Sequence, residues 1–142
     1  MPYEPFTEAW AQQYKEKLNQ NVQYRQVART WEGPIVFLLE KDPSVGLEED
    51  RWVYLDLRHG ECLEARVSSK ADLESAPTVI SGDAQTWKQL FDGRLEPLST
   101  LMRGRLRLVK GNMAELTAYV IASQQLMKTA MQIDTEIPEG LK

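Results

Sequence analysis

Two segments of the sequence carry the clearest structural pattern: Ser81-Gly82-Asp83-Ala84-Gln85-Thr86-Trp87-Lys88-Gln89-Leu90-Phe91-Asp92-Gly93 and, further on, Gly104-Arg105-Leu106-Arg107-Leu108-Val109-Lys110-Gly111-Asn112. In the first segment, Asp83 can cap a helix that starts at Ala84, and Gly93 suits the left-handed position after a helix end. In the second, leucine alternates with arginine at the period of a strand. Both segments supply apolar faces, and neither has a nucleophile, a base or a metal cluster beside it.

The rest of the chain divides into helices and strands by the same criteria. Apolar residues at helical spacing predict helices at residues 6–19, 22–31 and 95–102, and β-prone or alternating runs predict strands at 35–39, 51–57, 63–67 and 77–80. Residues 70–76 are interpreted as a polar connection. Asn112 and Glu115 have the spacing of a capping box, which predicts a long helix to about Met131. This order predicts an α+β fold with a five-stranded, mostly antiparallel sheet and helices packed on one face.

Length and composition fit one soluble domain. The 142 residues can bury a core, and the net charge of −4 gives no electrostatic support for nucleic-acid binding. The single cysteine excludes an internal disulfide framework, and neither a signal-peptide profile nor an apolar run of roughly 18 residues is present, so we expect a cytoplasmic protein. We divide the domain 1–142 into a helical N-terminal extension (1–32), a core (33–131) and a loose tail (132–142).

The last predicted helix has two apolar faces. One narrow face holds Met113, Leu116, Val120, Met127 and Met131, and a second, nearly opposite, holds Ala114, Ala118 and Ile121. Two faces indicate that the helix is either buried in the core, which periodicity alone favours, or contributes a wall to a cavity, for which adaptable methionine side chains are suited. The same two interpretations stay open for Trp87, Leu90 and Phe91.

Other candidate groups give weaker signals. His59 and Cys62 form an isolated pair with too few partners for a zinc site. Arg103, Arg105 and Arg107 could contact a lipid headgroup or phosphates, although a solvated strand face is the simpler interpretation. Trp52 and Tyr54 lie on the strand face opposite Val53 and Leu55, so if helices cover one side of the sheet these two are exposed and could mark a dimer interface.

Three short motifs in order resemble the sterol carrier protein 2 family of lipid-binding domains. They are Gly93-Arg94-Leu95-Glu96-Pro97, Met102-Arg103-Gly104-Arg105-Leu106 and Lys110-Gly111-Asn112-Met113-Ala114. The similarity is strongest from about Ile80 to Leu126. Thr30-Trp31-Glu32-Gly33 and Tyr54-Leu55-Asp56-Leu57-Arg58-His59-Gly60-Glu61-Cys62 look like the stand-alone prokaryotic branch of this family.

The resemblance implies a sheet covered by helices around an apolar tunnel that binds a fatty acid, fatty acyl-CoA, phospholipid or sterol without catalysis, metal or cofactor. A protein that carries such a ligand could also contact membranes transiently. Carried over by position, the ligand-binding residues are Trp87, Leu90, Phe91, Leu98, Leu101, Met102, Leu106, Leu108, Met113, Leu116, Val120 and Met127. Two alternatives stay open: an accessory or oligomerisation module with a vestigial cavity, and an enzyme acting on a hydrophobic acyl or steroid substrate, with Tyr119 and Glu115 as distant candidates for its catalytic groups.

Overall fold

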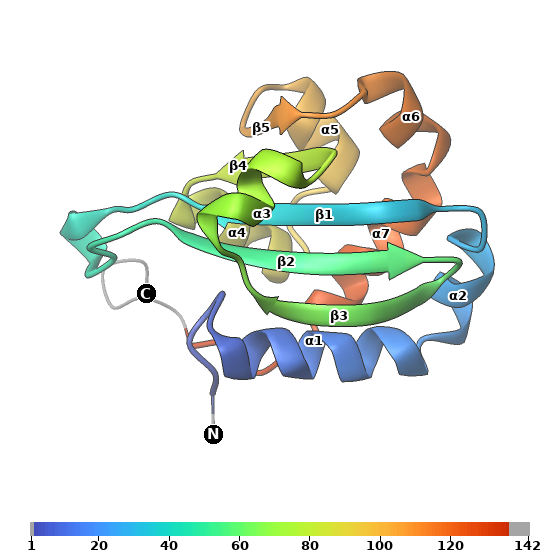
Figure 1. Ribbon diagram of the computed structural model, residues 1–142. Helices are drawn as coiled ribbons and strands as arrows, with labels where there is room; N and C mark the ends of the chain where they lie inside the picture. The colour runs from blue at the N-terminus through green and yellow to red at the C-terminus, as the bar shows by residue number, and fades with distance from the viewer. Residues whose placement is uncertain (1, 137–142) are drawn as a thin grey trace.

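The computed structural model describes residues 2–136. In this part of the chain the elements are α1 (Glu8–Gln20), α2 (Val22–Val27), β1 (Glu32–Leu39), a short 3-10 helix η1 (Pro43–Val45), β2 (Arg51–Arg58), β3 (Glu61–Val67), α3 (Lys70–Ser75), β4 (Thr78–Gly82), α4 (Ala84–Phe91), α5 (Pro97–Met102), β5 (Leu106–Lys110), α6 (Met113–Ala118) and α7 (Val120–Ala130). Figure 1 shows the five strands as one sheet with helices gathered around it.

The predicted α+β architecture and its five-stranded sheet are confirmed. The strand order is β3-β2-β1-β4-β5, and every neighbouring pair is antiparallel except β1 and β4. A parallel pair requires a long crossover connection, which the chain supplies through β2, β3 and α3. The sheet is therefore mixed, with one parallel pair at its centre.

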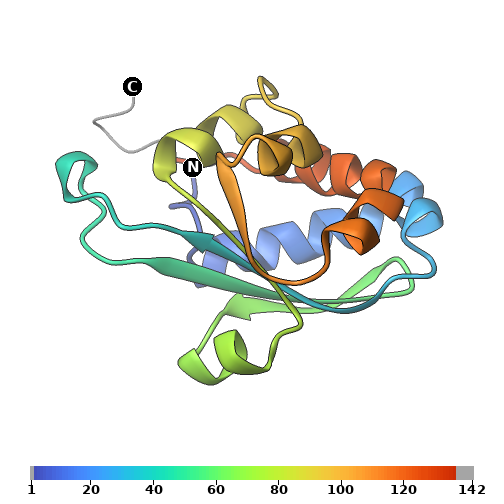
Figure 2. The same cartoon turned by 90° about the horizontal axis from the view of Figure 1, so that it is seen from above.

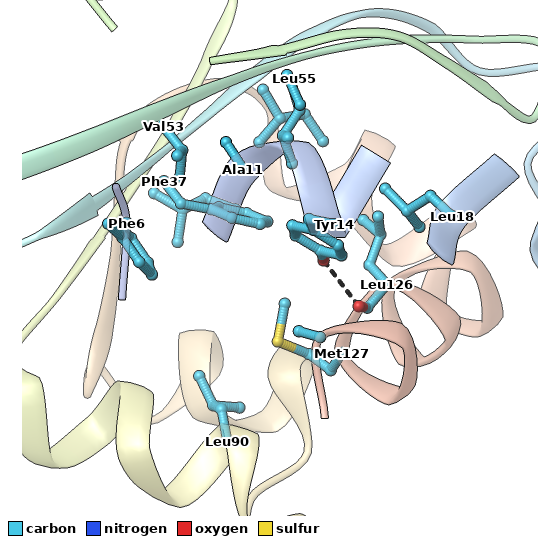
Figure 3. Packing of buried hydrophobic residues seen from close by; sticks show 14 of the residues in the cluster. Phe6, Ala11, Tyr14, Leu18, Phe37, Val53, Leu55, Leu90, Leu126 and Met127 are labelled. Carbon is cyan, nitrogen blue, oxygen red and sulfur yellow. Dashed lines mark hydrogen bonds between the residues drawn. The ribbon is translucent and has the colours of Figure 1, made fainter. Parts of the chain in front are cut away.

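Most helices cover one face of the sheet, as Figure 2 shows from above. Helix α1 contributes directly to the core under this layer, because Trp10, Tyr14 and Leu18 are fully buried. Tyr14 Oη donates a hydrogen bond to the carbonyl oxygen of Leu126 on α7, at 2.7 Å, which ties the first and last long helices together (Figure 3). Residues from both ends of the described chain thus build the same core.

The connection predicted at residues 70–76 is instead a helix, α3, and it lies on the opposite face of the sheet (Figure 2). Ser69 caps it in a complete capping box with Asp72, and the guanidinium of Arg66 binds the Asp72 carboxylate. This ion pair and its hydrogen bonds hold the pKa of Asp72 below its usual range. The spacing of Ser69 and Asp72 was the local signal for this helix.

The expectation that Trp52 and Tyr54 are exposed is wrong, because α3 packs on their side of the sheet. Both side chains are half-buried in a small second cluster with Val36, Val79 and Leu73 of α3. The guanidinium of Arg66 also lies 4.3 Å from the centre of the Tyr54 ring. Dimerisation through this face stays a prediction.

The expected alternation in the third strand fails because of a β-bulge. The register of β2 and β3 shifts between Asp56 and Leu57, so Cys62 is paired with Leu57 and points into the core. Leu63, which alternation would place on the same face as the buried Ala65, is instead 50% exposed. A bulge reverses the faces of the residues beyond it, which a strict period of two cannot anticipate.

The long helix predicted from Asn112 to Met131 is broken at Tyr119. Tyr119 leaves helical geometry (φ −112°, ψ 34°) and separates α6 from α7. Its hydroxyl lies 2.8 Å from the Thr30 hydroxyl, and its ring packs edge-on against Trp31 at 5.0 Å. These contacts with the segment after α2 hold Tyr119 where a straight helix would not place it.

Candidate functional site: a row of apolar pockets

Three apolar pockets lie between the sheet and its main helical layer. The middle pocket is bounded by β1, β4 and β5 on the sheet side and by α4, α5, α6 and α7 on the helix side. Its lining is hydrocarbon or aromatic apart from Ser123: Ile35, Phe37, Ile80, Trp87, Pro97, Leu98, Leu101, Leu106, Leu116, Ser123, Leu126 and Met127. In Figure 3, Phe37 and Met127 point toward the same interior region.

The exposure of its lining residues indicates where the middle pocket opens. All of its lining residues are buried except Leu101 on α5 and Ser123 on α7, which are half-buried. The pocket therefore reaches the surface between α5 and α7. Serine at this opening is compatible with both the apolar interior and water outside.

Two smaller pockets flank the middle one. The N-terminal pocket is lined by Pro5, Phe6, Leu39, Ala84, Trp87, Lys88, Phe91, Thr135 and Glu136. The α2 pocket is lined by Tyr24, Ala28, Trp31, Ile35, Leu57, Leu116, Tyr119, Ala122, Ser123 and Leu126. The middle pocket shares Trp87 with the former, and Ile35, Leu116, Ser123 and Leu126 with the latter, so the three form a row.

The pockets are narrow. The middle pocket encloses about 440 Å³ between its walls, the part open to solvent included, but the centre of a water molecule can reach only about 40 Å³ of it. The corresponding reachable space is about 20 Å³ in each flanking pocket. One water needs about 10–15 Å³ on this measure, so the middle pocket has room for about three waters. The tunnel that the resemblance implies therefore stays a prediction, since the structure shows three narrow pockets that share lining residues.

The structure places the twelve predicted ligand-binding residues in four environments, of which the exposed surface holds only Met102. Trp87, Leu98, Leu101, Leu106, Leu116 and Met127 line the middle pocket, and Phe91 lines the N-terminal pocket. Leu90 is fully buried in the core, and Leu108, Met113 and Val120 are half-buried, but these four line none of the three pockets.

Met102 is the clear exception among the predicted residues, since 73% of it is exposed. It ends α5 just before the turn at Gly104, whereas Leu101 faces the middle pocket. The resemblance carries both residues over by position, and position along a short helix does not determine which of two neighbouring side chains faces inward.

On the sheet side, sequence reasoning found Leu106 of β5 but missed the pocket residues of β1 and β4. Ile35 and Phe37 of β1 and Ile80 of β4 line the middle pocket, whereas their sequence pattern predicts only that they belong to strands. Ile35 and Phe37 alternate along β1, and that alternation marks the inward face. It could not show which inward residues border empty space.

Ionisable groups lie outside the middle pocket. Burial raises the pKa of Tyr14 well above its usual value, and Tyr24 and Cys62 add to the effect. Burial likewise raises the pKa of Tyr24, with a further contribution from Cys62. Both phenols therefore stay neutral at neutral pH. Neither lines the middle pocket, so neither is placed to act as an acid or a base toward a ligand there.

The His59 and Cys62 pair does not form a site. His59 is exposed, and its ring binds the Glu32 carboxylate at 2.9 Å and contacts the Arg29 carbonyl oxygen, whereas Cys62 is buried. Within residues 2–136 we find no group of three His, Cys, Asp or Glu side chains placed to hold a metal ion. The two residues are close in sequence because they belong to the β2–β3 hairpin, with His59 in its turn and Cys62 in β3.

Burial raises the pKa of the Cys62 thiol to about 12. The thiol therefore stays protonated at about pH 8, and we expect iodoacetamide to modify the folded protein on the order of a thousandfold more slowly than the protein unfolded in guanidinium chloride. Mass spectrometry of timed samples measures both rates. Equal rates in the two conditions would show that Cys62 is accessible in the native state.

The arginine cluster has partners of its own. Arg107 binds the Glu40 carboxylate at 2.7 Å, and Arg105 reaches the Thr86 hydroxyl at 3.4 Å. Arg103 is exposed on the turn between α5 and β5, next to the exposed Met102. Contact of these residues with lipid headgroups or membranes stays a prediction.

The fold and the pockets define a class of protein: a mixed-sheet α+β domain with an apolar interior between its sheet and helices. The profile of the SCP-2 sterol transfer family matches residues 11–121, so the chain belongs to this family. This membership supports binding or transfer of lipids or sterols in general, and the family is generally a non-catalytic lipid carrier fold.

Solved structures agree with this assignment. A crystal structure of sterol carrier protein 2 is 44% identical, with a TM-score of 0.83 over 92% of this chain and 99% of the other. The solution structure of a conserved hypothetical protein of Thermus thermophilus, possibly a sterol carrier protein, is 43% identical, with a TM-score of 0.83 over 94% of this chain and 92% of that one. Apo sterol carrier protein 2 of Yarrowia lipolytica, 22% identical with a TM-score of 0.57 over 85% of this chain and 88% of that one, shares the fold.

A search of curated proteins finds no significant match. Among the helices of residues 2–136, none combines the length and the apolar character that crossing a bilayer requires.

Proposed function

We propose that this protein binds a long-chain lipid non-covalently, with the alkyl chain held first of all by the middle pocket between the sheet and the helical layer. The observation that carries the proposal is the lining of the middle pocket, which is apolar around its whole interior and opens between α5 and α7. Each methylene moved from water into such a lining contributes roughly 0.8 kcal/mol, so a long chain binds well with few polar contacts.

Binding requires side chains to move, because the reachable space of the pockets is smaller than a long alkyl chain. Met127, Leu101 and Leu98 border the middle pocket, and unbranched or singly branched side chains rearrange at low cost. A flexible alkyl chain can enter as these residues shift one after another. A rigid sterol ring would need several walls to move together, so the geometry favours an acyl ligand.

The enzyme alternative lacks a suitably placed group in this geometry. Glu115 is exposed on α6 and lines none of the three pockets. The Tyr119 hydroxyl is engaged with Thr30 at the edge of the α2 pocket. A catalytic acid or base must reach the reacting atom of a bound substrate. Glu115 borders none of the three pockets, and Tyr119 borders only the α2 pocket, where its hydroxyl is already paired with that of Thr30.

Native mass spectrometry followed by solvent extraction tests the proposal. We expect the purified protein to carry host fatty acid or phospholipid, and the delipidated protein to take up a fluorescent fatty acid that unlabelled fatty acid displaces more effectively than a sterol does. A protein that is purified empty and takes up no probe would contradict lipid binding. Displacement by the sterol alone would overturn the preference for acyl chains and leave lipid binding standing.

A further inference from the structure

We infer that Trp87 sets the greatest length of alkyl chain that the pockets accept, by closing the middle pocket toward the N-terminal pocket. The inference rests on the proposed lipid binding and concerns only its selectivity. Among the described residues, Trp87 alone lines both of these pockets. By contrast, four residues separate the middle pocket from the α2 pocket, so no single side chain controls that boundary.

The indole of Trp87 is fixed on both sides. Its Nε1–H donates to the carbonyl oxygen of Leu38 on β1 at 3.0 Å. Its ring lies 5.3 Å from Phe37, 5.3 Å from Phe6 and 6.0 Å from Phe91, measured between ring centres. A hydrogen bond to the sheet and three aromatic neighbours determine one orientation, which makes Trp87 a stiffer wall than the leucines elsewhere in the pockets.

Gly82 makes room for this wall. A Cβ atom on Gly82 would lie 3.0 Å from Trp87 Nε1 and 2.6 Å from Leu106 Cδ2. The missing side chain therefore lets the indole and Leu106 both approach the end of β4. The β4 backbone at Gly82 and the indole of Trp87 together separate the middle pocket from the N-terminal pocket.

The N-terminal pocket beyond Trp87 has a definite far end. Pro5 and Phe6 line it together with Thr135, and the chain near both termini is joined there by a β-bridge between Tyr3 and Thr135. Arg51 also binds the Pro5 carbonyl oxygen at 3.0 Å. Lys88, Phe91 and Thr135 of this pocket are half-buried and Glu136 is exposed, so its outer side meets solvent. Removing the indole would join the apolar lining formed by Phe6, Leu39 and Ala84 to the middle pocket and so lengthen the space open to an alkyl chain.

The expected signature is a change in chain-length dependence. For the unmodified protein, affinity for saturated fatty acids should rise about fourfold per added methylene and then level off once the chain end meets Trp87. In Trp87→Leu the rise should continue to longer chains before it levels off. Short chains, which do not reach Trp87, should bind the variant and the unmodified protein equally.

Displacement of a fluorescent fatty acid from the delipidated protein by fatty acids of increasing length measures this dependence. Gln85→Ala is the matched control, because Gln85 lies on the same helix as Trp87, is exposed and lines none of the three pockets. Its plateau should stay at the length seen for the unmodified protein. A plateau at the same length in Trp87→Leu would overturn the inference.

A second measurement needs no variant and remains decisive if Trp87→Leu does not fold. A fatty acid with a diazirine at its terminal carbon, bound to the unmodified protein at the plateau length, should label Trp87 or Phe37 and not Phe6. Labelling of Phe6 would overturn the inference, as would labelling confined to the α2 pocket residues Tyr24 and Trp31. If fatty acids of every length fail to bind the unmodified protein, the proposed function itself fails.

Discussion

Leu116→Arg is expected to lower lipid affinity by at least about a hundredfold, which corresponds to about 2.7 kcal/mol. Leu116 is buried on α6 and lines both the middle pocket and the α2 pocket. A guanidinium there would lie among apolar groups with no partner. Binding of an alkyl chain would remove water from this charge, and the free energy of that desolvation would oppose binding. Titration of the delipidated variant with a fluorescent fatty acid measures the loss.

Ala118→Arg is the matched control, since Ala118 lies on the same short helix with its side chain exposed. It should bind lipid as the unmodified protein does. Val120→Arg should have a smaller effect than Leu116→Arg, because Val120 is half-buried and lines none of the three pockets. Equal losses from Leu116→Arg and Ala118→Arg would show that charge on α6, and not the pocket wall, governs binding.

A buried arginine can also unfold the domain, so a gentler substitution separates the two effects. Ser123 is half-buried at the opening of the middle pocket, where Ser123→Trp would fill space without burying a charge. Circular dichroism should then show an unchanged fold, while lipid uptake falls. Full uptake by a folded Ser123→Trp variant would place the ligand elsewhere.

Trp10→Ala is expected to lower the free energy of unfolding by about 3–5 kcal/mol, the usual cost of truncating a fully buried large aromatic residue. Trp10 has no exposed surface, and its indole N–H donates to the Thr135 hydroxyl at 2.9 Å. Its ring centre lies 5.0 Å from that of Phe6 and 5.2 Å from that of Tyr14. Urea denaturation followed by circular dichroism measures the change.

Glu16→Ala, an exposed position on the same helix, is the control and should change stability by less than about 0.5 kcal/mol. A small effect of Trp10→Ala would support the initial interpretation of residues 1–32 as an extension of a self-sufficient core. A large effect would show that α1 is needed to close the core, as the burial of Trp10, Tyr14 and Leu18 indicates.

Local chemistry predicted most of the secondary structure. Asp83 caps α4, with its carboxylate accepting from the Thr86 N–H at 2.8 Å, and Gly93 adopts the left-handed conformation expected of it (φ 77°). Asn112 likewise caps α6 by accepting from the Glu115 N–H. These signals involve residues within a few positions of one another, so they can be interpreted without knowing the rest of the fold.

Helix α3 was missed although its capping signal is local, whereas two other failures depend on contacts that no local pattern shows. The last helix breaks at Tyr119 because of contacts with Thr30 and Trp31, which lie far away in sequence. The outward turn of Leu63 depends on a bulge in the pairing of β3 with β2. Neither hydrophobic periodicity nor a helix cap carries information about such contacts. Tertiary packing therefore determines both the helix break at Tyr119 and the exposure of Leu63.

The fold class, the order of most elements and the family can be predicted without coordinates, because hydrophobic periodicity, helix caps and short motifs involve neighbouring residues. Which apolar residues border empty space depends instead on how distant elements pack. Ile35 of β1, Trp87 of α4 and Leu116 of α6 meet around one pocket although more than twenty positions separate each from the next. A cavity is a property of how distant surfaces fit together, and an apolar side chain looks the same in sequence whether it fills the core or lines a pocket.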